Sequence, residues 1–320
     1  MRFIVVGAGA VGGIVGGRLI GAGHEVILVA RGAHADAIEK SGLTLQAPTG
    51  TRVFRPAALW RPGEGELKSG DIVLLCVKSQ DTREALAALR GETGDTVAIA
   101  CVQNGVTNEA EAEQRFAAVY GAMIWTPAVH LEPGVVASYA ERDALIRVGR
   151  WPEGEDERAR NLAAALSNAG LEAASVPDVA RWKRGKLLSN LVNALDAFIA
   201  PGGRADLFRA LVGEGVAVFT AASLPFIPLA EFTSYAMERL PELKLEGRDR
   251  PGGSTWQSLA RGIRSSEVAY FNGYVVELGA AHGVPTPYNR VLVELAGEFE
   301  RGERALRSVT ADELRARAAG

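Results

Sequence analysis

Two lysines and two asparagines recur at helical spacing in the middle of the chain. Their positions step by three, four and three residues, so one face of the helix expected over residues 179–199 carries Lys183, Lys186, Asn190 and Asn193. A lysine there can give a proton to a carbonyl oxygen that becomes an alkoxide when hydride arrives. Lysines are usually solvated instead, but paired asparagines are poor helix formers and need another reason for their positions.

Lys186 is the better general acid of the two lysines. It lies four residues before Asn190, and helical side chains lean toward the helix start, so Lys186 shares a row with the asparagines. Desolvation lowers the pKa of a lysine toward neutrality, which suits proton donation. Lys183 lies one turn nearer the expected exposed end of the helix, and we expect its loss to change kcat by less than about tenfold.

A second chemical motif, G-x-G-x-x-G, follows the apolar run at residues 3–6. Gly7 permits a tight turn, Gly9 lets the backbone approach a pyrophosphate, and Gly12 allows close packing of a helix on a strand. The exposed amides at the helix start, those of Ala10 and Val11 among them, attract phosphate groups. An apolar run on each side of the motif gives the order strand, turn, helix, strand, which predicts a dinucleotide-binding βαβ unit.

The same glycines also resemble the small-xxx-small pattern of a membrane helix dimer, because Gly9, Gly13 and Gly17 recur every four residues. The stretch between Arg2 and Arg18 has only 15 residues, short of the roughly 20 that span a bilayer. A signal peptide would need a polar cleavage region, which is absent here. We therefore favour the nucleotide-binding interpretation.

The residue after the second strand predicts the cofactor. NAD-binding units place an acidic residue there to bond the ribose hydroxyls, whereas this chain has Arg31 and no acid until Asp36. A guanidinium suits a 2′-phosphate. We expect NADPH rather than NADH, although a solvated loop arginine would look the same.

Polar residues follow two further apolar runs. The run at 71–77 ends at Lys78, and the run at 96–102 ends at Gln103-Asn104-Gly105. Ligands bind at the carboxyl edge of a parallel sheet, so we expect Lys78 and Asn104 on the cofactor side. The alternative for Asn104-Gly105 is an ordinary turn.

The elements that position these residues predict an α/β fold. We expect an N-terminal Rossmann-type domain with a parallel sheet at 1–175 and an all-helical C-terminal domain at 176–320. Further expected strands lie at 43–46, 51–54, 119–124 and 145–148, with helices at 34–41, 81–90 and 154–169. The helices expected in the second domain cover 179–199, 204–224, 229–240, 255–281, 287–301 and 310–318.

Composition narrows the partners. The chain has 320 residues, 48% hydrophobic content and a formal charge of −3, which gives no general attraction to nucleic acid or membrane surfaces. Its 2 cysteines lie in apolar runs and lack the spacing of a disulfide scaffold or a metal site. We therefore expect a cytoplasmic protein with a small-molecule substrate and no metal. The sequence leaves the oligomeric state open, and a homodimer is compatible with it.

Over nearly its whole length the chain resembles the ketopantoate reductases (2-dehydropantoate 2-reductases). The similar segments are GAGAVG, Arg31, the strand end at Lys78, Asn104-Gly105, Lys186-x-x-x-Asn190, Ser254-Thr255-Trp256-Gln257, Glu267 through Gly273, and His282 through Pro287. The resemblance implies NADPH-dependent reduction of a 2-oxo acid to a 2-hydroxy acid. The implied substrate is 2-dehydropantoate, reduced to pantoate in pantothenate biosynthesis.

The same resemblance implies roles for individual residues. Lys186 would be the general acid, and Glu267 would bond the reacting oxygen. The remaining substrate contacts would come from Ser254, which holds the carboxylate, and from Asn104 and Asn190, which position nicotinamide and substrate. Apart from the resemblance, we also expect a substrate contact from Asn193 on the same helix face. Taken without the resemblance, Ser254 is also a suitable helix cap and Glu267 a solvated acid.

Two other functions remain open. A β-hydroxyacid dehydrogenase also carries a helical Lys-x-x-x-Asn beside a Rossmann domain, although the segments at Ser254 and Glu267 count against it. A redox regulator that binds NADPH without turnover is the third interpretation. The residues at Asn193 and Ala269 depart from the family pattern and keep it open.

Overall fold

The computed structural model describes residues 1–248, 252–260, 262 and 265–320. Internal contacts divide the chain into two compact units. The first comprises Met1–Lys183 and Ala230–Arg250, and the second comprises Arg184–Leu229 and Pro251–Gly320. The expected domain boundary at 175/176 stays a prediction, whereas the contacts divide the chain inside a helix, after Lys183.

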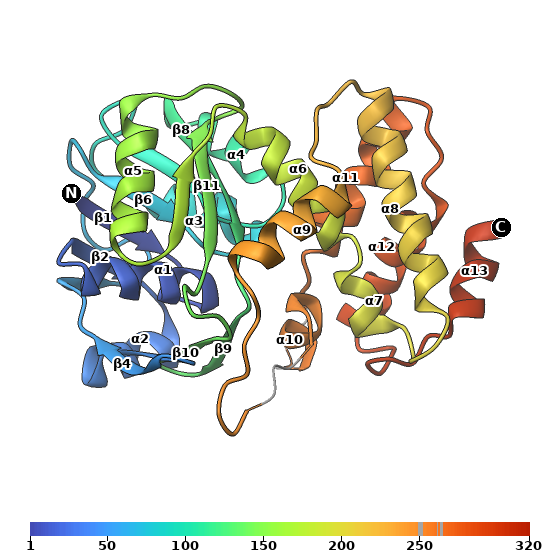
Figure 1. Ribbon diagram of the computed structural model, residues 1–320, viewed down its shortest axis with the longest axis horizontal. Coiled ribbons are helices and arrows are strands. Elements are labelled where there is room, and N and C mark those ends of the chain that lie inside the picture. The colour runs from blue at the N-terminus through green and yellow to red at the C-terminus, as the bar shows by residue number, and fades with distance from the viewer. Residues whose placement is uncertain (249–251, 261, 263–264) are drawn as a thin grey trace. The chain divides into compact units, whose positions relative to one another are not determined.

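An eight-stranded sheet forms the frame of the first unit (Figure 1). The strand order is β12-β11-β8-β7-β6-β1-β2-β5, and every neighbouring pair is parallel except β8 with β11. This sheet confirms the predicted α/β class. Its strands are β1 (Arg2–Val6), β2 (Glu25–Val29), β5 (Ala58–Trp60), β6 (Ile72–Leu75), β7 (Ala98–Cys101), β8 (Ala118–Trp125), β11 (Leu145–Arg150) and β12 (Glu172–Ser175).

Both faces of this sheet are covered, which explains why its central strands are continuously apolar. In β1, Phe3 and Val5 belong to a core layer shared with helices α1 and α5, whereas Ile4 and Val6 belong to the opposite layer, with α3 and α4. The covering helices are α1 (Ala10–Gly21), α5 (Glu157–Asn168), α3 (Thr82–Ala88) and α4 (Asn108–Glu113).

A second, four-stranded sheet packs on α1. Its order is β4-β3-β10-β9, with β3 (Leu43–Ala47), β4 (Gly50–Phe54), β9 (Ala128–Glu132) and β10 (Val135–Ser138). The hairpin of β3 and β4 was predicted, whereas β9 and β10 were not. A Cβ at Gly17 or at Gly21 would come within 2.9 Å of the Phe54 ring, so these small residues let α1 lie against the sheet. Among the described residues, no helix is both long and apolar enough to cross a membrane, and the expected cytoplasmic location stays a prediction.

The first unit also contains α2 (Gly32–Ser41), the short 3-10 helix η1 (Ser79–Asp81) and α9 (Leu229–Arg239). The helix predicted at 229–240 is confirmed as α9, but it packs on the first unit. The Phe232 ring meets Trp125 at a centroid distance of 5.7 Å, and Arg147 donates to the Tyr235 hydroxyl at 2.8 Å.

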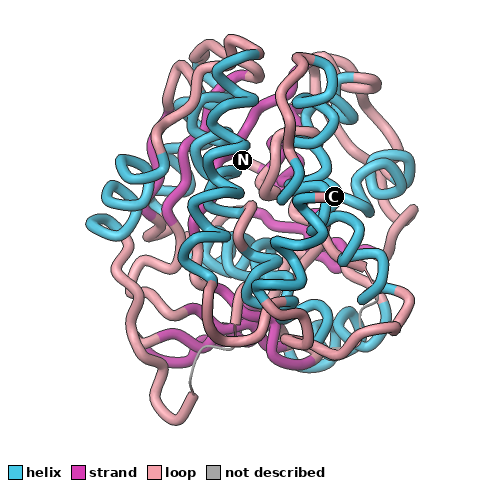
Figure 2. Tube along the Cα trace, turned by 90° about the vertical axis from the view of Figure 1, so that its right-hand side faces the viewer, coloured by secondary structure: helices cyan, strands magenta, loops and turns pink. Residues whose placement is uncertain are grey.

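The second unit is helical (Figure 2). Its helices are α6 (Val179–Asn190), of which the first turn belongs to the first unit, α7 (Asn193–Phe198), α8 (Arg204–Ala221), α10 (Ser254–Ala260), α11 (Val268–Ala281), α12 (Pro287–Glu300) and α13 (Ala311–Ala319). Stacked rings of Phe198 and Phe299, 4.3 Å apart, lie in its core. This arrangement confirms the predicted helical C-terminal region.

Two predicted long helices are wrong in extent. The helix expected at 179–199 is interrupted at Leu191 and Val192, where the Asn272 side chain donates to the Leu191 carbonyl at 3.0 Å. The helix expected at 255–281 is likewise divided into α10 and α11. Between them Gly262 has a φ of +74°, a left-handed conformation that ends a right-handed helix.

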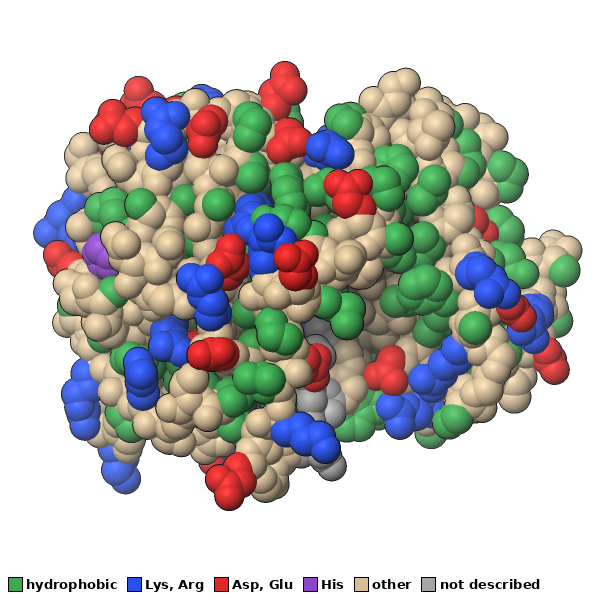
Figure 3. All heavy atoms as spheres, in the orientation of Figure 1, with side chains coloured by type: hydrophobic (Ala, Val, Ile, Leu, Met, Phe, Trp, Pro, Cys, Tyr) green, Lys and Arg blue, Asp and Glu red, His purple; other side chains and the backbone are tan. Residues whose placement is uncertain are grey.

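Charged side chains are mixed on the surface that Figure 3 draws. Basic and acidic groups alternate there over the first unit. Surface ion pairs of the first unit include Arg61 with Asp36 and Arg83 with Glu111.

Candidate active site

Four residues predicted to face the cofactor follow four neighbouring parallel strands. Gly7 follows β1, Arg31 follows β2, Lys78 follows β6 and Asn104 follows β7. The pairing registers align the last residues of these strands, because Val6 pairs with both Val29 and Leu75, and Leu75 pairs with Cys101. The structure therefore brings these residues to one edge of the sheet.

The glycine turn at this edge has the shape that a dinucleotide requires. Gly7 has a φ of +97°, and a Cβ on Gly12 would lie 2.0 Å from the Gly7 carbonyl oxygen. At Gly9, by contrast, an added Cβ would meet no described atom within 4 Å. Because no described side chain caps α1, the amides of Ala10 and Val11 are available to an anion. The turn fits a pyrophosphate.

Arg31 precedes α2 and is open to solvent. Its side chain is 71% exposed, and its Nη2 lies 3.5 Å from the Asp81 carboxylate. The nearest acid along the chain, Asp36, is paired with Arg61. A cationic group therefore lies where NAD-binding units hold an acid. Its contact with Asp81 was not predicted from the sequence.

His34 supports the glycine turn from α2. The Gly134 amide donates to its Nδ1 at 2.9 Å, and the His130 Nε2 lies 3.1 Å from the same atom. The proton is therefore on Nε2, which donates to the Ala8 carbonyl at 2.7 Å. Burial lowers the pKa of His34, and the bond to Ala8 offsets part of that effect. His34 is thus a neutral support for the turn.

On α6, Lys186 and Asn190 are in direct contact. Lys186 Nζ donates to Asn190 Oδ1 at 2.8 Å and lies 3.3 Å from the Ser189 hydroxyl. Lys186 is half-buried, whereas Asn190 is 1% exposed. Asn190 Nδ2 is buried and has no hydrogen-bond partner among the described residues. The Asn190 side chain therefore holds the Lys186 ammonium through its oxygen and has a nitrogen donor left for another group.

The remaining predicted residues of the second unit lie at helix starts. Asn193 begins α7, so it lies beyond the helix break and not on the row of Lys186. Glu267 is 5% exposed and precedes α11. Ser254 begins α10, and its side chain lies outside the described part of the structure. The Gly253 amide donates to the Asp196 carboxylate at 2.9 Å, which holds the start of α10 against α7.

The expectation that Lys183 lies toward an exposed end is wrong. Lys183 is 2% exposed, its Nζ lies 3.3 Å from the Cys101 carbonyl oxygen, and it forms an ion pair with the fully buried Glu109. Burial raises the pKa of the Glu109 carboxyl, and the Lys183 ammonium offsets part of that rise. No local pattern could reveal this pair, since its members are 74 positions apart.

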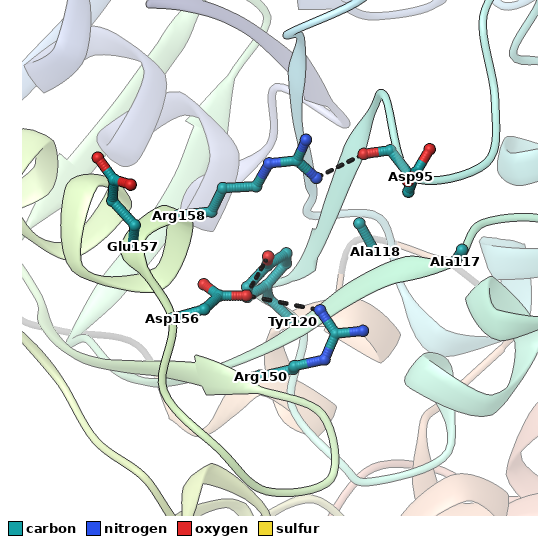
Figure 4. Close-up of a pocket in the computed structure, with 8 residues that line it drawn as sticks. All are labelled: Asp95, Ala117, Ala118, Tyr120, Arg150, Asp156, Glu157 and Arg158. Carbon is teal, nitrogen blue, oxygen red and sulfur yellow. Dashed lines mark hydrogen bonds and ion pairs between the residues drawn. The ribbon is translucent and has the colours of Figure 1, made fainter.

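A depression of about 420 Å³ lies at the opposite edge of the same sheet (Figure 4). Ala118 begins β8 there, and Arg150 ends the antiparallel β11. The Tyr120 hydroxyl donates to the Asp156 carboxylate at 2.8 Å, and burial raises the pKa of Tyr120 to about 12. Asp156 also caps α5. The polar side chains here therefore cap the start of α5. They lie at the opposite end of the strands from the glycine turn.

Comparison with known proteins agrees with this geometry. A family model described as Ketopantoate reductase PanE/ApbA matches residues 3–153, and the model of its C-terminal part matches 187–300. A 2-dehydropantoate 2-reductase of Halobacterium salinarum is 32% identical over 94% of this chain and 99% of its own length. One from Pyrococcus horikoshii is 28% identical over 91% of this chain and 95% of its own length.

Solved structures extend the comparison. A PanE/ApbA family ketopantoate reductase from Ralstonia eutropha has a TM-score of 0.76 and 30% identity, with 95% of this chain and 99% of that chain covered. A D-mandelate dehydrogenase solved with NADH and anilino(oxo)acetate shares the fold, with a TM-score of 0.80 at 23% identity over 95% of this chain and all of that one (100%). The chain belongs to the ketopantoate reductase PanE/ApbA family and is an NAD(P)H-dependent oxidoreductase of 2-oxo acids.

Proposed function

We propose that this protein reduces 2-dehydropantoate to pantoate with NADPH. The observation that carries the proposal is the contact on α6, where the Lys186 ammonium is held at 2.8 Å by an asparagine whose own amide donor is buried without a described partner. Family membership supports the choice of substrate, since the relatives at 32% and 28% identity are 2-dehydropantoate 2-reductases.

Lys186 supplies the proton in this proposal. A bound nicotinamide supplies the hydride, which goes to the carbonyl carbon of the substrate. As the C=O π bond breaks, its electron pair moves to oxygen, and Lys186 protonates that oxygen to give the 2-hydroxy acid. The Asn190 carbonyl keeps the ammonium in place, so proton donation needs no large movement of the lysine.

The other residues of the second unit orient the substrate. Glu267 is proposed as the acceptor that bonds the new hydroxyl group, because it is almost fully buried at the start of α11. Ser254, at the start of α10, is proposed to hold the carboxylate, and Asn193, at the start of α7, to add a further contact. Asn190 Nδ2 is a donor available to the substrate.

The first unit is proposed to hold the dinucleotide. The turn of Gly7, Gly9 and Gly12 with the amides of Ala10 and Val11 fits the pyrophosphate, since the space beside Gly9 is open. The exposed Arg31 guanidinium is suited to the 2′-phosphate. Lys78 and Asn104, at the ends of β6 and β7, would contact the nicotinamide half.

A panel of branched and aromatic 2-oxo acids, 2-dehydropantoate included, tests the proposal through NADPH absorbance. We expect the highest kcat/KM with 2-dehydropantoate, and a higher value for another acid would reassign the substrate. Absence of turnover with every acid, together with tight NADPH binding, would instead favour a regulator. Parallel runs with NADH decide the cofactor, since equal efficiencies would contradict the role of Arg31.

A further inference from the structure

The buried Lys183 and Glu109 form an ion pair in which charge is poorly compensated. Lys183 is 2% exposed and Glu109 is fully buried. Among the described residues, Lys183 Nζ has one other acceptor, the Cys101 carbonyl oxygen at 3.3 Å. The Glu109 Oε2 atom is buried with no hydrogen-bond partner among the described residues. Both charges have therefore left water with incomplete replacement of their hydrogen bonds.

Stability alone does not account for such a pair. Replacing a buried ion pair with apolar side chains of similar volume is often neutral or stabilising, whereas removing one partner is costly. A close-packed side chain such as methionine opposite leucine would fill the same space with no desolvation penalty. What the pair does that an apolar contact cannot do is hold a backbone carbonyl by a directed hydrogen bond.

The groups that Lys183 holds are the two ends of one loop. Cys101 is the last residue of β7, and Glu109 lies in the first turn of α4. The loop between them carries Asn104, whose own carbonyl accepts from the Asn108 side chain at 3.1 Å. Gln103 is tied down as well, by donation to the Thr82 hydroxyl at 2.8 Å. Asn104 itself is only half-buried, at the edge where the cofactor is proposed to bind.

The same side chain also fixes the start of α6. This helix continues without interruption from Lys183 to Lys186, so a shift of the helix at Lys183 also shifts the proposed proton donor one turn later. One ammonium group is thus bonded to the strand end that precedes Asn104 and belongs to the helix that carries Lys186.

We propose that Lys183 and Glu109 are positioning residues for hydride transfer, which hold the Asn104 loop and the start of α6 in fixed register. This inference rests on the proposed function. It replaces the expectation from sequence that Lys183 contributes little to the rate. Misplacement of reacting groups by about 1 Å can cost on the order of 10²-fold in rate, so we expect loss of the pair to lower kcat about 10- to 100-fold while NADPH affinity changes less than about threefold.

The test uses a double variant, Lys183→Met with Glu109→Leu, which removes both charges and leaves neither partner orphaned. Its matched control removes an ion pair of the first unit in which the acid is fully buried and the arginine largely so, Arg18 with Asp143, as Arg18→Met with Asp143→Asn. Asparagine is chosen because Asp143 has a φ of +61°, a conformation that asparagine tolerates. Lys183→Arg tests rescue, since a guanidinium can still donate to both acceptors.

Two readouts separate positioning from stability. For the double variant we expect a decrease in kcat with little change in NADPH affinity. The single variant Lys183→Arg, which keeps Glu109, should retain part of the kcat that the double variant loses. The control should have an unchanged kcat. Hydrogen-deuterium exchange should speed up at least about tenfold in residues 102–107 of the double variant alone. Unchanged kcat or unchanged exchange in these residues would overturn the inference. Failure of the proposed function has a different signature, because the unaltered protein would then reduce none of the 2-oxo acids, and the exchange comparison would still decide the role of the pair.

Discussion

Lys183 and Lys186 lie one turn apart on α6 in opposite surroundings. Lys183 is 2% exposed and neutralised by a carboxylate, whereas the half-buried Lys186 is held by a neutral amide. Removing either member of a buried ion pair leaves the charge of the other without a partner, so such a pair suits a fixed structural contact. The Asn190 amide oxygen orients the Lys186 ammonium through a hydrogen bond of 2.8 Å. This difference supports the proposed roles, proton transfer for Lys186 and positioning for Lys183.

Removal of the Lys186 ammonium should have the largest effect. Loss of a positioned general acid costs roughly 10²- to 10⁴-fold in rate, so Lys186→Ala should lower kcat by about that factor. NADPH affinity, which we propose to depend on the first unit, and the melting temperature should change little. Lys244→Ala, at an exposed position, serves as control. Near-normal kcat in Lys186→Ala would reverse the assignment of the two lysines.

Removal of the Glu109 carboxylate, the partner of Lys183, should lower the free energy of unfolding. Glu109→Ala leaves the Lys183 ammonium buried without its partner, which should lower the free energy of unfolding by about 3–5 kcal/mol in urea titrations. Glu111→Ala, in the same helix, breaks a pair whose arginine is 80% exposed and should cost less than about 1 kcal/mol. Equal losses in the two variants would mean that burial does not distinguish the pairs.

Arg31 extends the comparison to an exposed cation. If it binds the 2′-phosphate through charge-assisted hydrogen bonds, each worth about 1.5–3 kcal/mol, Arg31→Asp should lower kcat/KM with NADPH about 10- to 150-fold. The value with NADH should change far less. Arg52→Asp, on exposed β4, makes the same change in net charge. A similar loss of kcat/KM with both cofactors would show that Arg31 does not bind the 2′-phosphate.

Protonation of His34 should have the smallest effect on stability, because this residue supports the glycine turn as a neutral side chain. Its pKa is lowered from the ordinary value of 6.5, so the unfolded chain binds more protons in acid than the native protein does. Its stabilising contribution is therefore complete above 6.5 and is lost as the pH falls through that value toward the lower native pKa. The loss should be less than about 1 kcal/mol, because His34 is only half-buried and solvent screens part of the effect.

Urea midpoints at about pH 8 and about pH 5.5 measure this effect. His34→Gln should shrink the difference between the two midpoints, whereas His282→Gln, at an exposed position, should leave it unchanged. A pH dependence that is the same in His34→Gln as in the unaltered protein would assign the acid sensitivity to other groups.

Local patterns in the sequence predicted the features that neighbouring residues determine. The strand before Gly7, the strand ends at Lys78 and Asn104, and the hairpin of β3 and β4 all rest on short-range periodicity. Distant partners determined what was missed. The break in the helix after Asn190 depends on Asn272, which supplies a donor to Leu191 from 81 positions away. Whether a lysine on a helix is solvated or buried likewise depends on an acid elsewhere in the chain.

The second sheet has a consequence for the order in which the cofactor turn matures. Gly7 and α1 are made before β3 and β10, but α1 has Phe54 on one side, and β3 pairs in parallel with β10. That pairing closes a loop of roughly ninety residues, which is slow for entropic reasons. Amides of α1 should therefore remain unprotected in ribosome-bound chains that end before Val135 and become protected once residues through Ser138 have emerged from the ribosome. During translation the native packing of α1 thus depends on residues more than a hundred positions downstream.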